Sequence, residues 1–271
     1  MSSKLIYQFS QKKTDGDKTM SGLLGGKGAN LAEMSNLGIN VPPGFTVTTE
    51  VCNYFIQNKS FPENFDKELS SSIKKLQDYS GKVFGNSDNP LLLSVRSGAK
   101  ISMPGMMDSI LNIGLNDENV NHLSKVFNDE RFALDSYRRL IQMYGNVVLG
   151  VDHKRFEAII ENKKRIDNLD SDAEFNPEHL QWIIDAYKNT IERFSSEPFP
   201  QDPQEQLIGS VKAVFNSWLN KRAITYRKIN NIPENWGTGA TVQTMVFGNL
   251  NENSGTGVAF TRFPSTGKNE L

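Results

Sequence analysis

The chain has 271 residues, which suffices for one large domain or two small ones. Its 30 Lys and Arg residues almost balance 31 Asp and Glu residues, and the formal net charge is -1. This balance argues against nucleic-acid binding, because such proteins gather positive charge to displace counterions. Hydrophobic residues make up 37%, and 16 Phe and 3 Trp residues can fill a buried core, which excludes a disordered chain.

Cysteine content and the N-terminal sequence predict the compartment. Cys52 is the single cysteine, which excludes an internal disulfide bond and a metal site of clustered cysteines. No stretch reaches the roughly 18 apolar residues that a membrane-spanning helix requires, and the N-terminal residues lack the apolar segment of a signal peptide. We therefore expect a cytoplasmic protein without a membrane partner.

Residues 1–115 are expected to form an α/β unit. Their pattern predicts a helix that ends at Gly38, a strand over 45–48 and a helix over 70–77. Residues 91–95 form a short apolar run, which predicts a buried strand that ends before Arg96.

Helical periodicity dominates residues 116–232. Four helices are predicted, around residues 133–144, 156–160, 176–194 and 202–218. The third and fourth begin at Asn176 and Asp202, each followed by proline, which is the pattern of a polar N-cap and a first helical residue. We expect their apolar stripes to pack against one another in an inserted helical block, with Arg138 on an outward face.

Residues 233–271 return to a β pattern. Two predicted strands, 242–247 and 258–261, flank a glycine-rich loop and indicate a hairpin. The sequence stops ten residues after the second strand, so we expect a piece of a longer protein. The expected fold class is thus α+β (α/β).

Lys27 lies between glycines in Gly25-Gly26-Lys27-Gly28, at the start of a predicted helix. Glycines let backbone N–H groups approach an anion, and a helix N-terminus favours negative charge. The spacing differs from that of a Walker motif. A flexible glycine-rich turn with an exposed lysine is the alternative interpretation.

Arg96 and Lys100 follow the predicted buried strand, and both can bind phosphate oxygens. Three methionines come next, around Pro104 and Gly105, and are interpreted as flexible core fillers.

The strand over 242–247 can offer backbone groups and an apolar bed to a planar base, although an amphipathic edge strand fits equally well. For Arg138 and Arg139, inside the first helix of the block, a solvated helix face is the default interpretation. None of the three histidines shows metal-ligand spacing.

Several of these segments together resemble the N-terminal part of the pyruvate, phosphate dikinase family. The resemblance is carried by the sequences at 24–34, 41–46, 94–100, 103–108, 135–139, 199–203, 242–249 and 254–262. It implies an ATP-grasp nucleotide-binding domain that is incomplete at its C-terminus. Its expected parts are a first α/β subdomain (1–115), an inserted helical block with a return helix (116–232) and a truncated hairpin of the second subdomain (233–271).

The resemblance also implies the reaction, in which ATP, phosphate and pyruvate interconvert with AMP, diphosphate and phosphoenolpyruvate through a phosphohistidine. Lys27 and Arg96 are implied to act on the ATP phosphates in catalysis. The implied ATP-binding set is completed by Lys100, Arg139, Gln243, Met245, Val246, Phe247 and Glu252. The strand 243–247 is implied to border the adenine, and Glu252 to face the ribose or phosphates.

The parts that complete the family's reaction are missing from the sequence. Mg²⁺ is expected as a cofactor with ligands beyond Leu271, and the swivelling phosphohistidine domain and C-terminal barrel are expected as partners in the full-length protein, which would be the form that dimerises. This chain alone is therefore expected to be inactive. A pyruvate, water dikinase-like enzyme and a non-catalytic nucleotide-binding module remain the alternatives.

Overall fold

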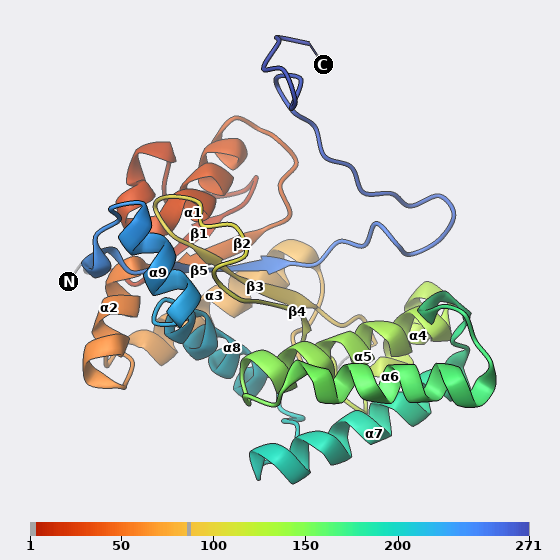
Figure 1. Ribbon diagram of the computed structural model, residues 1–271. Helices are drawn as coiled ribbons and strands as arrows, with labels where there is room; N and C mark the ends of the chain where they lie inside the picture. Colours follow the sequence, from red (N-terminus) through yellow and green to blue (C-terminus); the bar gives the residue numbers. More distant parts are fainter. Residues whose placement is uncertain (1–3, 86–87, 271) are drawn as a thin grey trace.

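The computed structural model describes residues 4–85 and 88–270. Positions 1–3, 86–87 and 271, which belong to the expected domains 1–115 and 233–271, lie outside the described residues. Helices and one five-stranded sheet make up the fold (Figure 1). The helices are α1 (Ser21–Asn36), α2 (Thr49–Asn58), α3 (Phe65–Ser80), α4 (Val120–Phe127), α5 (Glu130–Val147), α6 (His153–Asp167), α7 (Pro177–Ser195), α8 (Pro203–Ser217) and α9 (Lys221–Ile229). Short 3₁₀ turns span Lys18–Met20, Asp172–Glu174 and Glu234–Trp236.

The sheet has the strand order β1-β2-β5-β3-β4, and every one of these neighbours pairs antiparallel. The strands are β1 (Ile6–Phe9), β2 (Gly44–Val47), β3 (Leu93–Gly98), β4 (Ser109–Ile113) and β5 (Gly239–Thr244). The antiparallel pairing confirms the α+β class. It also shows that the expected strand 91–95 is shifted, since β3 continues to Gly98 and Arg96 lies within the strand rather than after it.

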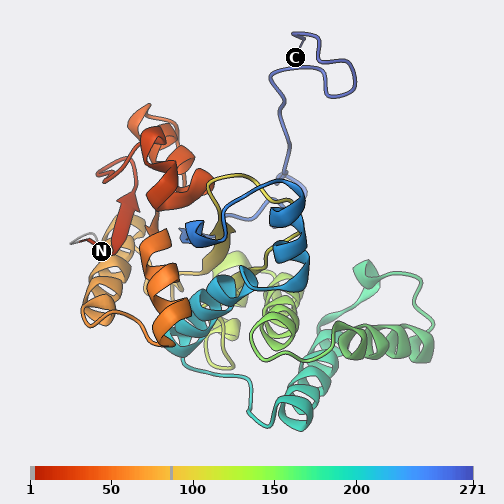
Figure 2. The same ribbon diagram turned by 60° about the vertical axis from the view of Figure 1, so that its left-hand side comes forward.

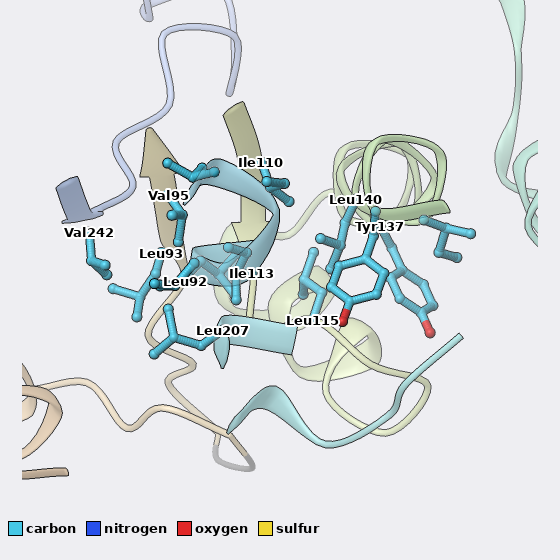
Figure 3. Close-up of a cluster of buried hydrophobic side chains, with 14 of the residues drawn as sticks. Leu92, Leu93, Val95, Ile110, Ile113, Leu115, Tyr137, Leu140, Leu207 and Val242 are labelled. Carbon is cyan, nitrogen blue, oxygen red and sulfur yellow. The ribbon is translucent and has the colours of Figure 1, made fainter. Parts of the chain in front are cut away.

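One face of the sheet is apolar and forms the main core. Figure 3 shows this cluster, in which Val95 of β3, Ile110 of β4 and Val242 of β5 lie near Leu207 of α8 and Leu140 of α5. The core joins side chains from both of the expected domains 1–115 and 116–232. The expected helices also pack on the sheet: α8 packs on β3, β4 and α2, and α5 packs on β4 and α4 as well as on α7. Of the four, α6 packs mainly on α7.

Arg138 faces the interior, which corrects the expected outward position. Its side chain in α5 is 5% exposed, and its Nε and Nη2 donate to Oδ1 of Asp135 at 2.9 and 2.7 Å. The neighbouring Arg139 is exposed and reaches Oδ2 of the same carboxylate at 2.7 Å. Helical periodicity identified the apolar stripe of α5 but could not show that the stripe's edge is covered by another helix.

The predicted hairpin over 242–247 and 258–261 is not formed. β5 pairs with β2 and β3, which lie far away in the sequence, and residues 258–261 form no strand. The chain after β5 runs away from the sheet (Figure 1), with Val258 80% and Phe260 55% exposed. Within residues 4–85 and 88–270, no helix combines the length and apolar content needed to cross a membrane.

Candidate anion-binding site

The glycine-rich segment interrupts α1 and starts a new helical turn. Gly25 has φ 69° and ψ 164°, which are not helical values, and the helix resumes at Gly26. Gly26 N donates to the carbonyl oxygen of Ala99 at 2.9 Å, so the new turn lies against the segment that follows β3. The first N–H groups of a helix have no partner inside it. The break therefore presents a helix start at the C-terminal end of β3.

Small residues let α1 lie directly on the polar face of the sheet. A Cβ on Gly28 would stand 2.6 Å from Oγ1 of Thr46 in β2, so glycine is needed for this approach. Gly98 of β3 is equally close to the helix: a Cβ on Gly98 would stand 3.2 Å from Cβ of Lys27. Arg96 is two residues before Gly98 and shares its face of β3. The packing of α1 thus brings Lys27 next to Arg96.

The two cations affect each other. Lys27 Nζ donates to the carbonyl oxygen of Ser97 at 2.8 Å. Although part of its side chain is open to solvent, burial of the ammonium group lowers the pKa of Lys27, and the charge of Arg96 lowers it further. Burial also lowers the pKa of Arg96. A bound anion would stabilise the charged form of both side chains.

Gln243 holds the guanidinium of Arg96. Its Oε1 accepts from Nη2 of Arg96, and its Nε2 donates to the carbonyl oxygen of Pro42 at 2.9 Å. Nε of Arg96 is buried and has no hydrogen-bond partner among the described residues. A buried N–H donor without a partner costs free energy, so Arg96 has capacity for one more acceptor.

A cavity of about 650 Å³ lies between the restarted α1 and the β3–β4 loop. Its polar lining consists of Lys27, Asn30, Ser97, Lys100, Ser102 and Ser109. No carboxylate lines it, and in the described part of the chain none of Lys27, Arg96 and Lys100 forms an ion pair. Lys100 places its Nζ 4.5 Å from the centre of the Trp236 ring. Arg96 is not among the lining residues, but it precedes the lining residues Ser97 and Gly98 in β3. Lys27 and Lys100 therefore give the cavity a positive charge that no carboxylate of its lining compensates.

Other residues of the predicted set lie elsewhere. Met245 and Phe247 pack against the main core, Phe247 with its ring 5.0 Å from that of Phe132, whereas Val246 between them is 69% exposed. Arg139 pairs with Asp135 on α5 and does not line the cavity. Glu252 is exposed in the segment after β5.

The described residues do not fit a Mg²⁺ site. Mg²⁺ prefers carboxylate and water oxygens in octahedral geometry. Within residues 4–85 and 88–270 no three His, Cys, Asp or Glu side chains gather in one place, and the cavity lining is cationic. The expectation of ligands beyond Leu271 stays a prediction.

Sequence reasoning missed several lining groups. Ser102, Ser109 and Asn30 carry no local signal, because serine and asparagine are ordinary loop and helix-surface residues. The role of Gln243 as a support for Arg96 was also missed; the polar alternation of its strand was visible, but not the strand beside it.

A basic cavity at a glycine-rich helix start suits an anionic ligand. Comparison with protein families extends this result: the family described as "Pyruvate phosphate dikinase, AMP/ATP-binding domain" matches residues 21–83 and 56–271. The chain belongs to this family.

Curated relatives agree with the family match. The chain is 52% identical over 269 residues to pyruvate, phosphate dikinase of Rhizobium meliloti and 50% identical over 267 residues to that of Clostridium symbiosum. It is 48% identical over 269 residues to the chloroplastic pyruvate, phosphate dikinase 1 of Oryza sativa. These alignments cover 99%, 98% and 99% of the chain but 30%, 30% and 28% of the relatives. The chain thus spans less than a third of their length.

Proposed function

We propose that this chain binds ATP and holds the triphosphate in the cavity between α1 and the β3–β4 loop. The observation that carries the proposal is the pair of Lys27, which lines the cavity, and Arg96 beside it, two neighbouring cations that have no carboxylate partner among the described residues. Charge-assisted hydrogen bonds from Lys27 to phosphate oxygens would offset the repulsion between the two groups. The charge of Arg96, which precedes the lining residue Ser97 in β3, would add to the attraction.

In the whole protein we assign this chain to the nucleotide-binding part of a pyruvate, phosphate dikinase. Phosphoryl transfer depends mainly on positioning and on neutralising the charge of the transferred group. Lys27 and Arg96 would supply that neutralisation while ATP phosphorylates a histidine on a separate, swivelling domain, and a barrel domain would then use pyruvate and phosphoenolpyruvate. The ATP-grasp architecture and the use of phosphate and Mg²⁺ belong to the same proposal. The names of the relatives and their identity to this chain support it.

The adenine is proposed to lie along the chain that leaves β5. Val246 is exposed there while Met245 and Phe247 are anchored in the core, so the main chain is held and one apolar side chain is free to contact a base. Gln243 then acts on the phosphates through Arg96 rather than on the adenine.

The proposal is tested by calorimetric titration of the chain with ATP and with adenosine in a metal-free buffer. A hydrogen bond to a charged group contributes about 1.5–3 kcal/mol, so Lys27→Ala and Arg96→Met should each weaken ATP binding at least about tenfold. Adenosine binding should be unchanged. Lys74→Ala, which removes an exposed lysine of α3, is the matched control and should bind ATP as the unmodified chain does.

The melting temperature separates binding from folding. Substitutions of exposed charges usually change stability by less than about 0.5 kcal/mol. The melting temperature of Lys27→Ala should therefore lie close to that of the unmodified chain. Unchanged ATP affinity in both Lys27→Ala and Arg96→Met would contradict the proposal.

A further inference from the structure

The loop over residues 99–108 forms one wall of the cavity and has little packing of its own. Only Met103 in this loop is buried, at 8% exposure. Pro104 and Gly105 form a turn in which Met106 N donates to the carbonyl oxygen of Met103 at 3.1 Å, and Gly105 has φ 71°. This is the pattern of a type II turn. The position of the whole loop therefore depends on a few contacts with its neighbours.

The strongest of these contacts come from Arg222 near the start of α9. Its guanidinium forms an ion pair with Oδ1 of Asp108, and its Nε donates to the carbonyl oxygen of Met106 at 3.1 Å. Asn220 Nδ2 donates to Oδ2 of Asp108 at 3.2 Å. A guanidinium presents several donors in a rigid plane, so one Arg222 side chain binds two points of the loop.

Two further contacts join the loop to the same part of the chain. Met103 packs with Trp218, Ala223 and Ile232 in a small separate core. Lys100 at the other end of the loop lies over Trp236. Figures 1 and 2 allow the loop between β3 and β4 to be followed toward the blue segment of α9. Residues 218–236 thus fix the loop near its beginning, middle and end.

We propose that Arg222 is a positioning residue for the triphosphate, acting through Asp108 and the carbonyl of Met106. By fixing the loop before the ligand arrives, it would keep Lys100 and Ser102 opposite Lys27 and reduce the ordering cost of binding. The residue itself does not line the cavity that contains Lys27. This inference rests on the proposed binding of ATP phosphates in that cavity.

The test is a double-mutant cycle on Asp108 and Arg222, read by calorimetric titration with ATP and with inorganic tripolyphosphate. Arg222→Gln and Asp108→Asn should each weaken both ligands by roughly three- to tenfold. The double variant should lose less affinity than the sum of the two single losses, because the two residues share the Arg222–Asp108 ion pair. Arg222→Lys keeps the charge but not the planar donors. Its affinity for both ligands should lie between that of Arg222→Gln and that of the unmodified chain.

Arg165→Gln is the matched control, since Arg165 on α6 bonds only to Asn162 of the same helix among the contacts described. NMR relaxation of residues 105–108 supplies a second measurement: Arg222→Gln should increase their mobility, and Lys27→Ala should not. Asp108→Asn is nearly isosteric, so it keeps the test valid if Arg222→Gln folds poorly.

The outcomes separate this inference from the proposed function. If Arg222→Gln and Asp108→Asn bind ATP within twofold of the unmodified chain while Lys27→Ala loses affinity, the inference is wrong and the proposed function stands. Additive losses in the double variant would also overturn the inference. If Lys27→Ala keeps its affinity as well, the proposed function itself fails.

Discussion

Gly25 of α1 faces Gly98 of β3 so closely that a Cβ on Gly25 would overlap the carbonyl oxygen of Gly98. Gly25 also has a positive φ of 69°, which side chains of L-residues rarely adopt. Both features are needed for the helix start that carries Lys27 to approach the sheet.

Gly25→Ala should therefore destabilise the chain by about 2–5 kcal/mol, as the sum of left-handed strain and an overlap with backbone. Urea unfolding measures this loss. Gly38→Ala is the control, because Gly38 has φ 78° but open space around it, and it should cost only the strain, about 1–2 kcal/mol. Equal losses in the two variants would show that α1 does not depend on the approach of Gly25 to Gly98.

The buried Arg138 should contribute far more to stability than the adjacent Arg139. Removing one partner of a buried ion pair costs about 3–5 kcal/mol, and since Asp135 keeps Arg139 as a partner we expect about 3 kcal/mol for Arg138→Ala. Arg139→Ala removes an exposed pair and should cost less than about 1 kcal/mol. Thermal unfolding of the two variants gives the comparison, and similar values would place Arg138 in solvent.

Trp218 should be the main stabilising residue of the small core beneath the β3–β4 loop. It is 2% exposed, stacks under Arg227 at 3.9 Å and donates from Nε1 to the carbonyl oxygen of Glu234 at 2.9 Å. Trp218→Ala should cost about 3–5 kcal/mol as a cavity mutation. Trp182→Ala is the control, because that ring is 42% exposed; a loss under about 1 kcal/mol at Trp218 would contradict the packing.

Local sequence signals predicted local structure well. Asn176 and Asp202 are the N-caps of α7 and α8, and Asp202 accepts from Gln204 N at 2.8 Å. Such caps are set by residues within one turn of each other. The hairpin prediction failed because the partners of β5 are β2 and β3, and strand pairing over long sequence distances leaves no trace in a short window.

For the candidate site, too, the sequence pointed to residues with a local pattern but not to the contacts that join distant parts of the chain. The glycines beside Lys27 and the apolar run before Arg96 pointed to the two cations, since each pattern lies within a few residues. The contacts that place them could not be predicted: Gln243 with Arg96, and Arg222 with Asp108, join residues more than 100 positions apart. These pairs exist only because the sheet order brings β5 beside β3 and α9 beside the loop.

The pKa of Lys27 tests the central claim most directly. In the free chain it should lie below 10.5, because burial and then Arg96 disfavour the charged form. Between the lowered pKa and 10.5 the unfolded chain binds more protons, so the contribution of Lys27 to the unfolding free energy rises with pH across that window. Arg96→Met should bring the pKa of Lys27 only part of the way back toward 10.5, because burial, the larger cause of the lowering, remains.

The decisive measurement is an NMR titration of the Lys27 side chain with and without saturating, metal-free ATP. A triphosphate next to the ammonium group favours its charged form, so the pKa of Lys27 should rise when ATP binds, and adenosine should leave it unchanged. A pKa of Lys27 that stays the same while ATP is bound would show that the phosphates lie elsewhere and would contradict the account.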